Sequence, residues 1–141
     1  MKWFFDSSVL VPVFHRDHVH HEASLQAFAV AEKKNACCAA HSLAEVYSTL
    51  TRLPGKGRLS GEQALLFLES IKGRCSIIVL DAEDYASAIE TAATMGIVGG
   101  TIYDALLAHC ALKADAETIL TWNVEDFRRL GPEVAKRIRT P

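Results

Sequence analysis

Residues 3–8 read WFFDSS, a short aromatic run that ends in a carboxylate. Trp3, Phe4 and Phe5 indicate a buried strand, and Asp6 is the first residue after it. Burying an unpaired carboxylate is costly, so Asp6 must cap a helix, pair with another group or bind a cation. The rest of the sequence has to distinguish among these uses.

Other apolar runs have the length of buried strands and alternate with segments of helical period. The strand-like runs cover residues 2–5, 36–40, 75–80 and 117–121, and the helical segments cover 20–34, 42–53, 60–72, 82–95 and 101–113. This alternation predicts a parallel sheet covered by helices on both faces, an α/β/α sandwich. The last residues, KRIRTP, fit either a short edge strand or a loose tail.

Length and composition indicate an ordinary globular chain. The 141 residues contain no linker, repeat or low-complexity segment, so we expect a single domain over 1–141. Half of the residues are hydrophobic and the formal charge is −2, which argues against a surface coated in basic residues. A local basic patch for nucleic acid remains compatible with this balance.

The cysteines and the apolar runs predict a cytoplasmic protein. Four cysteines occur without a C-x-x-C pair, which favours reduced thiols used as small core residues. No apolar run approaches the roughly 18 residues of a membrane span. Asp6 also interrupts the N-terminal apolar run before a signal peptide could form.

Acidic residues recur just beyond the predicted strands. Asp6 follows the first strand, Glu45 lies early in the helix after the second, and Asp104 lies early in its own helix. Asn123 and Asp126 follow the last strand. Ligands in open α/β sheets bind beyond the carboxyl ends of the strands, so these side chains are candidates for one shared site.

Helix capping is the simpler explanation for each acid taken singly. Ser42 and Glu45 have the form of a capping box, and Thr101 with Asp104 imitates one. Asn123 is a good N-cap residue, and any acid in a first turn is favoured by the helix dipole.

Several acids in one cleft would need more than capping. Two carboxylates about 4 Å apart repel by about 4 kcal/mol at an effective dielectric of 20, and a helix dipole relieves only about 0.3–1 kcal/mol. Either some acids are protonated or a divalent cation lies among them. Oxygen ligands without convergent Cys or His favour Mg²⁺ or Mn²⁺ over zinc.

Four motifs resemble the PIN-domain family, and the likeness is strongest to toxin ribonucleases of VapC type. They are FFDSSVLV (residues 4–11), SLAEV (42–46), GGTIYDALLA (99–108) and LTWNVEDF (120–127). Each motif is short and mostly apolar, and their order and spacing over the whole chain carry the resemblance. It implies a PIN-like fold, a Mg²⁺- or Mn²⁺-dependent endoribonuclease acting on single strands or tRNA, a homodimer and a cognate antitoxin.

The resemblance also implies roles for particular residues. By position, Asp6, Glu45 and Asp104 form the acidic core of catalytic residues and metal ligands. The fourth position falls on Asn123 or Asp126: Asn123 offers a carbonyl oxygen without charge, and Asp126 is the charged candidate. We keep both as metal ligands and expect Asp126 to be the catalytic one.

Other side chains are candidates for substrate contacts. We expect the hydroxyls of Ser7 and Thr121 to bond to phosphate or carboxylate. A set of basic residues is expected either to contact RNA phosphates or to be solvated surface charge. Its members are Arg52, Lys56, Arg58, Arg128 and Arg129.

Aromatic and histidine residues have competing interpretations. Trp122 fits core packing as well as it fits stacking on a base, whereas Tyr47 fits the core better. The stretch HRDHVHH contains His15, His18, His20 and His21 but matches no standard zinc pattern. We expect it to cap or precede a helix, and a phosphate contact fits it better than a metal site.

Two other functions compete with a nuclease. A D-x-D phosphatase fits poorly, because Asp6 is followed by Ser7 and Ser8. A receiver domain fits poorly, because residues 121–123 are Thr-Trp-Asn where a lysine is expected after the last strand. A non-catalytic PIN-like module that binds RNA or protein stays open, because Asn123 stands at the fourth position and fold resemblance alone does not establish activity.

Overall fold

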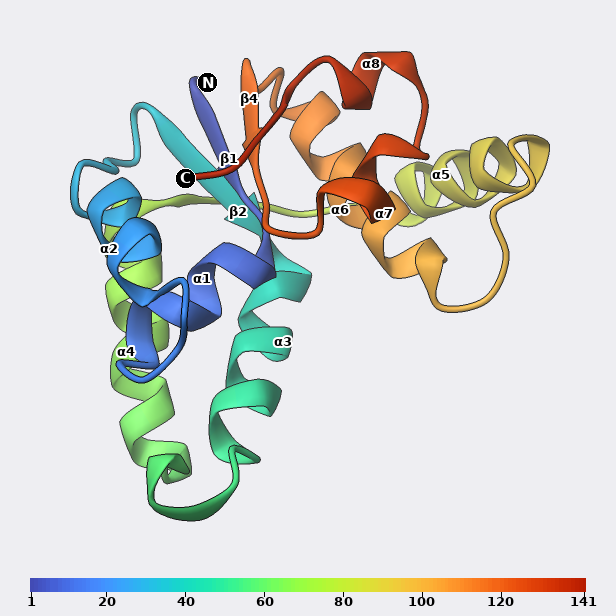
Figure 1. Ribbon diagram of the computed structural model, residues 1–141. Helices are drawn as coiled ribbons and strands as arrows, with labels where there is room; N and C mark the ends of the chain where they lie inside the picture. Colours follow the sequence, from blue (N-terminus) through green and yellow to red (C-terminus); the bar gives the residue numbers. More distant parts are fainter.

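The computed structural model describes residues 1–141 and is built on a five-stranded, all-parallel sheet (Figure 1). The strand order is β3-β2-β1-β4-β5, with β1 in the centre. The strands are β1 Trp3–Phe5, β2 Ala36–Ala39, β3 Ser76–Ile78, β4 Thr118–Leu120 and β5 Ile138–Arg139. The predicted parallel sheet is confirmed, and the C-terminal residues 138–139 form its edge strand.

Helices make every connection between the strands. α1 (Ser7–Phe14) and α2 (His21–Ala29) join β1 to β2; α3 (Ala40–Thr51), the 3₁₀ turn η1 (Gly55–Gly57) and α4 (Gly61–Arg74) join β2 to β3. α5 (Ala82–Thr94) and α6 (Thr101–Lys113) join β3 to β4, and α7 (Val124–Arg128) and α8 (Pro132–Ala135) join β4 to β5.

The strand order reverses beside β1. The chain moves outward through β2 and β3 and then returns to place β4 on the opposite side of β1. Such a reversal opens a crevice at the carboxyl ends of the two strands, which is where open α/β sheets bind ligands. Asp6 follows β1 and Thr121 follows β4, so both lie at this crevice.

Alternate residues of each central strand enter opposite halves of the core. Phe4 and Ile119 pack with α6, α7 and α8, whereas Phe5 and Leu120 pack with α1, α2, α3 and α4. Each half contains 13 buried residues. The sheet is therefore covered on both faces, and the predicted α/β/α sandwich is confirmed.

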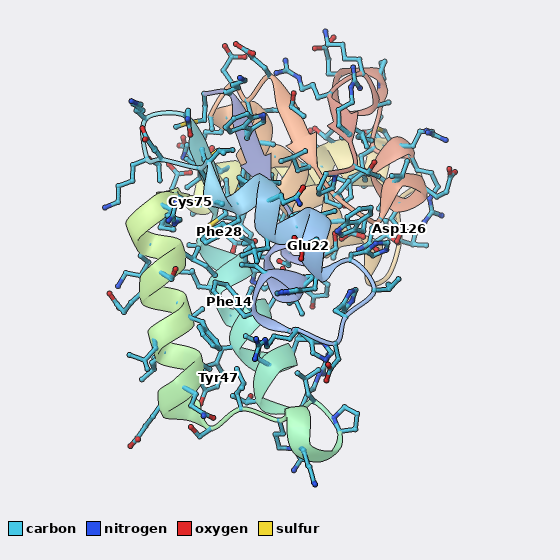
Figure 2. All side chains as sticks on the ribbon, turned by 60° about the vertical axis from the view of Figure 1, so that its left-hand side comes forward. Phe14, Glu22, Phe28, Tyr47, Cys75 and Asp126 are labelled. Atoms are coloured by element: carbon cyan, nitrogen blue, oxygen red, sulfur yellow. The ribbon has the colours of Figure 1, made fainter.

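α3 and α4 run side by side away from the sheet and join at η1, at the bottom of the view in Figure 1. An aromatic group fills the space between the N-terminal helices and α4, where Phe14 and Phe28 lie close together (Figure 2). Their ring centroids are 5.8 Å apart, and Phe14 also stacks on Phe67 at 4.6 Å. This packing joins α1, α2 and α4.

The sequence pattern did not reveal α1. Its residues SSVLVPVF are apolar almost throughout, and Pro12 lies inside the helix. Because α1 is buried on most sides, it has no polar face and therefore no helical period to detect. The short helices α7 and α8 were missed because they are too brief to show a period.

Several predicted helix boundaries are also wrong. The helix expected over 20–34 is shorter: α2 ends at Ala29, and Val30, just beyond it, is 60% exposed. α3 begins at Ala40, two residues before Ser42, and Tyr47 on this helix is 40% exposed rather than a core residue. Ser60, by contrast, caps α4 through a capping box with Gln63, as expected for the start of that helix.

All four cysteines are buried free thiols, in agreement with their predicted use as core residues. Burial raises the pKa of Cys37 to about 12 and that of Cys110 to about 11, which keeps both thiols protonated and unreactive. None of the helices combines the length and the apolar character needed to span a bilayer.

Replacing Phe4 should show how strongly the fold depends on the central strand. Phe4 is fully buried in β1, so Phe4→Ala should lower the free energy of unfolding by about 3–5 kcal/mol. Leu66→Ala on α4 is the control, because Leu66 is 71% exposed and its loss should change stability by no more than about 0.5 kcal/mol. Urea denaturation measures both, and equal effects would contradict the described core.

Candidate active site

A polar pocket of about 500 Å³ opens at the carboxyl edge of the sheet, beside the strand reversal. Asp6, Glu45 and Asp104 all line it, although 39 and 59 residues of chain separate them in sequence order. Asn123 lines it too. The structure therefore brings together the three acids of the predicted core with one candidate for the fourth position.

Asp6 is almost completely buried at the end of β1, with only 2% of its surface exposed. Its Oδ2 accepts hydrogen bonds from Ser8 Oγ at 2.6 Å and from Thr121 Oγ1 at 2.8 Å. The same oxygen caps α1 through Ser8 N at 3.4 Å. Burial raises the pKa of Asp6, and these hydrogen bonds oppose the rise.

Glu45 lies in the second turn of α3 and is half-buried. Ser7 Oγ donates to its Oε1 at 3.0 Å, and His41 Nε2 lies 3.8 Å from the same oxygen. Burial is the main reason that the pKa of Glu45 is raised; the charge of Asp6 adds to the rise, and Ser7 and His41 oppose it. Ser7 links this acid to α1, which begins directly after Asp6.

Asp104 lies in the first turn of α6 and accepts no hydrogen bond from another side chain. Its pKa is raised to about 6, first by burial and then by the charges of Asp6, Asp126 and Glu45, while Arg129 lowers it. This mutual repulsion is the electrostatic sign that the carboxylates share one region of space. A divalent cation would neutralise the negative charge that causes this repulsion.

The two candidates for the fourth position have different surroundings. Asn123 lines the pocket and is the N-cap residue of α7, but its side chain makes no capping hydrogen bond. Asp126, labelled in Figure 2, forms an ion pair with Arg129 at 2.8 Å. Its negative charge contributes to the raised pKa of Asp104. Asn123 therefore lines the pocket without a charge, whereas Asp126 is charged but does not line the pocket.

The capping boxes expected around two of the acids are absent. α6 begins at Thr101 itself, after Gly100, so Thr101 does not cap it. Ser42 lies inside α3, and its buried Oγ has no hydrogen-bond partner. Glu45 and Asp104 are therefore not held as partners of a cap, which weakens the simple capping explanation for both.

A hydroxyl network fixes the floor of the pocket. Ser8 and Thr121 hold the Asp6 carboxylate from α1 and from the end of β4, and Ser8 Oγ also accepts from the Trp122 backbone N–H at 2.9 Å. Phosphate and carboxylate are the two partners expected for the Thr121 hydroxyl. Thr121 is fully buried, and its hydroxyl bonds to the Asp6 carboxylate. Ser7 likewise bonds to a carboxylate, that of Glu45.

Sequence reasoning missed several residues of this pocket. Ser8 is not among the hydroxyls expected to bond to phosphate or carboxylate, yet it positions Asp6. His18 and His20 line the pocket because the segment between α1 and α2 folds back over it. No local sequence pattern predicts that this segment lies at the pocket, because its position depends on the contact between His20 and Trp122.

The predicted RNA-binding residues lie outside the pocket. Arg52 lines a neighbouring groove along α3 that also includes Glu45. Lys56 and Arg58 lie at the exposed turn between α3 and α4. Arg128 and Arg129 on α7 form exposed ion pairs with Glu125 and Asp126.

The donor set of the pocket fits a hard divalent cation. No group of three or more His, Cys, Asp or Glu side chains is arranged so that it could hold a metal ion. Mg²⁺ uses one or two carboxylates and fills its shell with water and phosphate oxygens, so such a group is not required. Carboxylates with raised pKa values, beside hydroxyls and an amide, match this chemistry.

Comparison with known proteins gives a consistent set of relatives. Residues 3–131 match the family model of the PIN domain. The chain is 35% identical over 132 residues to Ribonuclease VapC40 of Mycobacterium tuberculosis, covering 92% of this chain and 94% of the relative.

Solved structures share the fold. The crystal structure of M. tuberculosis VapC20, a sarcin–ricin loop cleaving toxin, superposes with a TM-score of 0.71 at 15% identity, over 89% of this chain and 92% of that one. VapBC2 from Rickettsia felis, bound to a DNA fragment from its promoter, gives a TM-score of 0.64 at 21% identity, over 99% and 98%.

The raised pKa of Asp104 predicts how stability depends on pH without metal. An unfolded Asp titrates near 3.8 and Asp104 near 6 in the fold, so the folded state binds the extra proton and loses stability as pH rises through this window. Asp104→Asn cannot ionise and should melt at a higher temperature than the parent at pH 7.5, with no difference below pH 4. Thermal unfolding in EDTA measures this, with the exposed Asp17→Asn as control. An Asp104→Asn that melts lower at pH 7.5 would contradict the described electrostatics.

Proposed function

The chain belongs to the PIN-domain family, and on that premise we propose that it is a VapC-type endoribonuclease that hydrolyses RNA with Mg²⁺ or Mn²⁺. In this proposal the 141 residues act as one PIN-like domain and as the toxin of a toxin–antitoxin pair. The family membership rests on the match over residues 3–131 and on 35% identity to a VapC ribonuclease.

One observation carries the catalytic part of the proposal: three acids from three separate elements line a single pocket. Asp6, Glu45 and Asp104 come from the end of β1, from α3 and from α6. Burial first, and then the charges of Asp6, Asp126 and Glu45, raise the pKa of Asp104. A fold gains nothing in stability from this arrangement, whereas cation and phosphate binding requires it.

In the proposed mechanism each residue has a distinct task. Asp6, Asp104 and Glu45 would hold the cation. When bound, a divalent cation supplies acidified water and neutralises charge on a phosphate. Ser8 and Thr121 keep the Asp6 carboxylate in place, and Ser7 orients Glu45. No side-chain nucleophile is needed.

We assign the fourth position to both candidates, with different tasks. The Asn123 side-chain carbonyl offers a neutral oxygen at the pocket. Asp126 adds the negative charge from α7, where its pairing with Arg129 limits its repulsion of Asp104. Asp126 is the catalytic member of the two in this proposal.

The RNA backbone must be attracted from outside the pocket. None of the residues that line the pocket is Lys or Arg. We assign phosphate contacts to Arg52, Lys56 and Arg58 along α3 and its turn, and to Arg128 and Arg129 on α7. Such contacts make affinity fall steeply with salt. Transfer RNA is one candidate substrate of this kind.

The proposed antitoxin would bind over the same acidic pocket. A pocket with three carboxylates and no Lys or Arg attracts a cationic group, and a basic antitoxin residue supplies one. The structural likeness to the R. felis VapBC2 complex supports a cognate partner of this type.

We also propose that the chain forms a homodimer through α5 and the start of α6. α5 lies at the outer edge of the molecule, where it packs against α6 (Figure 1). Large apolar side chains are exposed along this edge, and a second copy would cover them. They include Tyr85, Ile89, Met95, Val98 and Tyr103.

RNA cleavage by the purified chain tests the enzymatic proposal. With Mn²⁺ or Mg²⁺ the parent should cut RNA, and Asp6→Asn or Asp104→Asn should lower the rate at least about 100-fold because metal ligation is lost. Millimolar Mn²⁺ should also raise the melting temperature of the parent by mass action but not that of the double variant.

Glu83→Gln, on an exposed part of α5, is the matched control and should cleave like the parent. Full activity in EDTA, or in the double variant of Asp6 and Asp104, would overturn the metal-dependent mechanism.

Light scattering after size exclusion tests the dimer. The parent should have twice the chain mass of 15.4 kDa, and the combined change Ile89→Lys with Val98→Lys should shift it to the monomer mass, because charge on the apolar edge prevents its burial. Leu66→Lys on α4 serves as the control. A dimer that survives the combined change would exclude this interface.

A further inference from the structure

We propose that His20, stacked on Trp122, is a nucleobase platform that holds an unpaired RNA base at the wall of the acidic pocket. This inference rests on the proposed ribonuclease function and deepens it. It assigns substrate positioning to a histidine segment that the catalytic mechanism leaves unused.

The two rings form a flat, anchored pair. Their centroids are 3.7 Å apart with an interplanar angle of 7°, and both residues line the pocket. The Trp122 indole donates from Nε1 to Ser24 Oγ at 2.9 Å, and its backbone N–H donates to Ser8 Oγ at 2.9 Å. Because Ser8 also holds Asp6, the platform keeps a fixed position relative to the catalytic acids.

The negative charge of the pocket favours contacts with RNA that do not depend on charge. Three carboxylates and no Lys or Arg line it, so the side chains around the scissile phosphate repel a polyanion. Stacking of a base on an aromatic ring does not depend on charge and strengthens binding about 5- to 150-fold per base. His20 and Trp122 supply such a surface within the pocket.

The neighbouring residues favour a base over a phosphate at this wall. Val19, at the tip of the segment, is 86% exposed and also lines the pocket, which places an apolar side chain beside the rings. His18 Nδ1 accepts the backbone N–H of His20 at 3.0 Å. Burial, followed by the other histidines, lowers the pKa of His18, so this ring is a neutral neighbour and not a cationic phosphate ligand.

The fold itself does not account for the His20 ring. His20 precedes α2 as its N-cap residue but makes no capping hydrogen bond. It takes part in no ion pair, and its main contact is the stacked indole. Truncating this side chain should therefore leave the protein folded.

Binding of defined oligonucleotides tests the platform. A fluorescein-labelled (A)₁₂ RNA and an abasic twelve-residue oligomer of equal charge are titrated in Mg²⁺, with all proteins in an Asp104→Asn background that blocks cleavage. His20→Ala should weaken binding of (A)₁₂ about tenfold and leave binding of the abasic oligomer unchanged. His20→Phe keeps a ring without a proton to donate and should restore affinity to within about twofold.

His109→Ala removes the same type of side chain from α6, outside the pocket, and is the matched control. An equal loss with the abasic oligomer, or no rescue by His20→Phe, would mean a phosphate contact and overturn the platform. Unchanged binding of (A)₁₂ by His20→Ala would overturn it as well.

Steady-state cleavage separates this inference from the function on which it rests. In the active chain, His20→Ala should raise KM about tenfold for the RNA that the parent cuts, with kcat within about twofold. Cleavage by the parent with an unchanged KM for His20→Ala would refute the platform alone. A parent that neither binds nor cleaves RNA would refute both.

Discussion

The structure depends on one buried carboxylate. Asp6 lies at the end of the central strand with 2% of its surface exposed, and two hydroxyls from different elements bond to the same oxygen. Those bonds join β1, α1 and the end of β4 at a single point. Because an unpaired buried charge is strongly destabilising, this network decides where the surrounding chain can lie. The pocket is the space left beside it.

The carboxylates around Asp6 lie close enough to repel one another. Glu45 and Asp104 approach from α3 and α6, and burial together with mutual repulsion raises the pKa of each. The packing of the two core halves must offset the free-energy cost of placing these carboxylates close together. Two of the acids lie on helices, which hold side chains more firmly than loops do. A divalent cation, as we propose, would offset this repulsion.

The pocket is chemically divided. Its floor is acidic, one wall carries stacked aromatic rings, and the basic side chains lie outside it on α3, its turn and α7. We propose that this division separates three tasks: catalysis at the floor, base positioning at the wall and attraction of the RNA backbone from outside the pocket. The acidic floor is also the surface to which, in our proposal, a basic antitoxin segment binds.

Sequence alone determined the strands, the longer helices and the acids beyond the strand ends, because periodicity and charge placement are local properties. It did not determine α1, which has no polar face, or the lack of capping boxes at Ser42 and Thr101, because helix starts depend on neighbouring packing. Tertiary structure alone decided that Asn123, and not Asp126, lines the pocket and that His20 stacks on Trp122. These contacts join segments about 100 residues apart, and the parallel sheet order, not any local pattern, makes them neighbours.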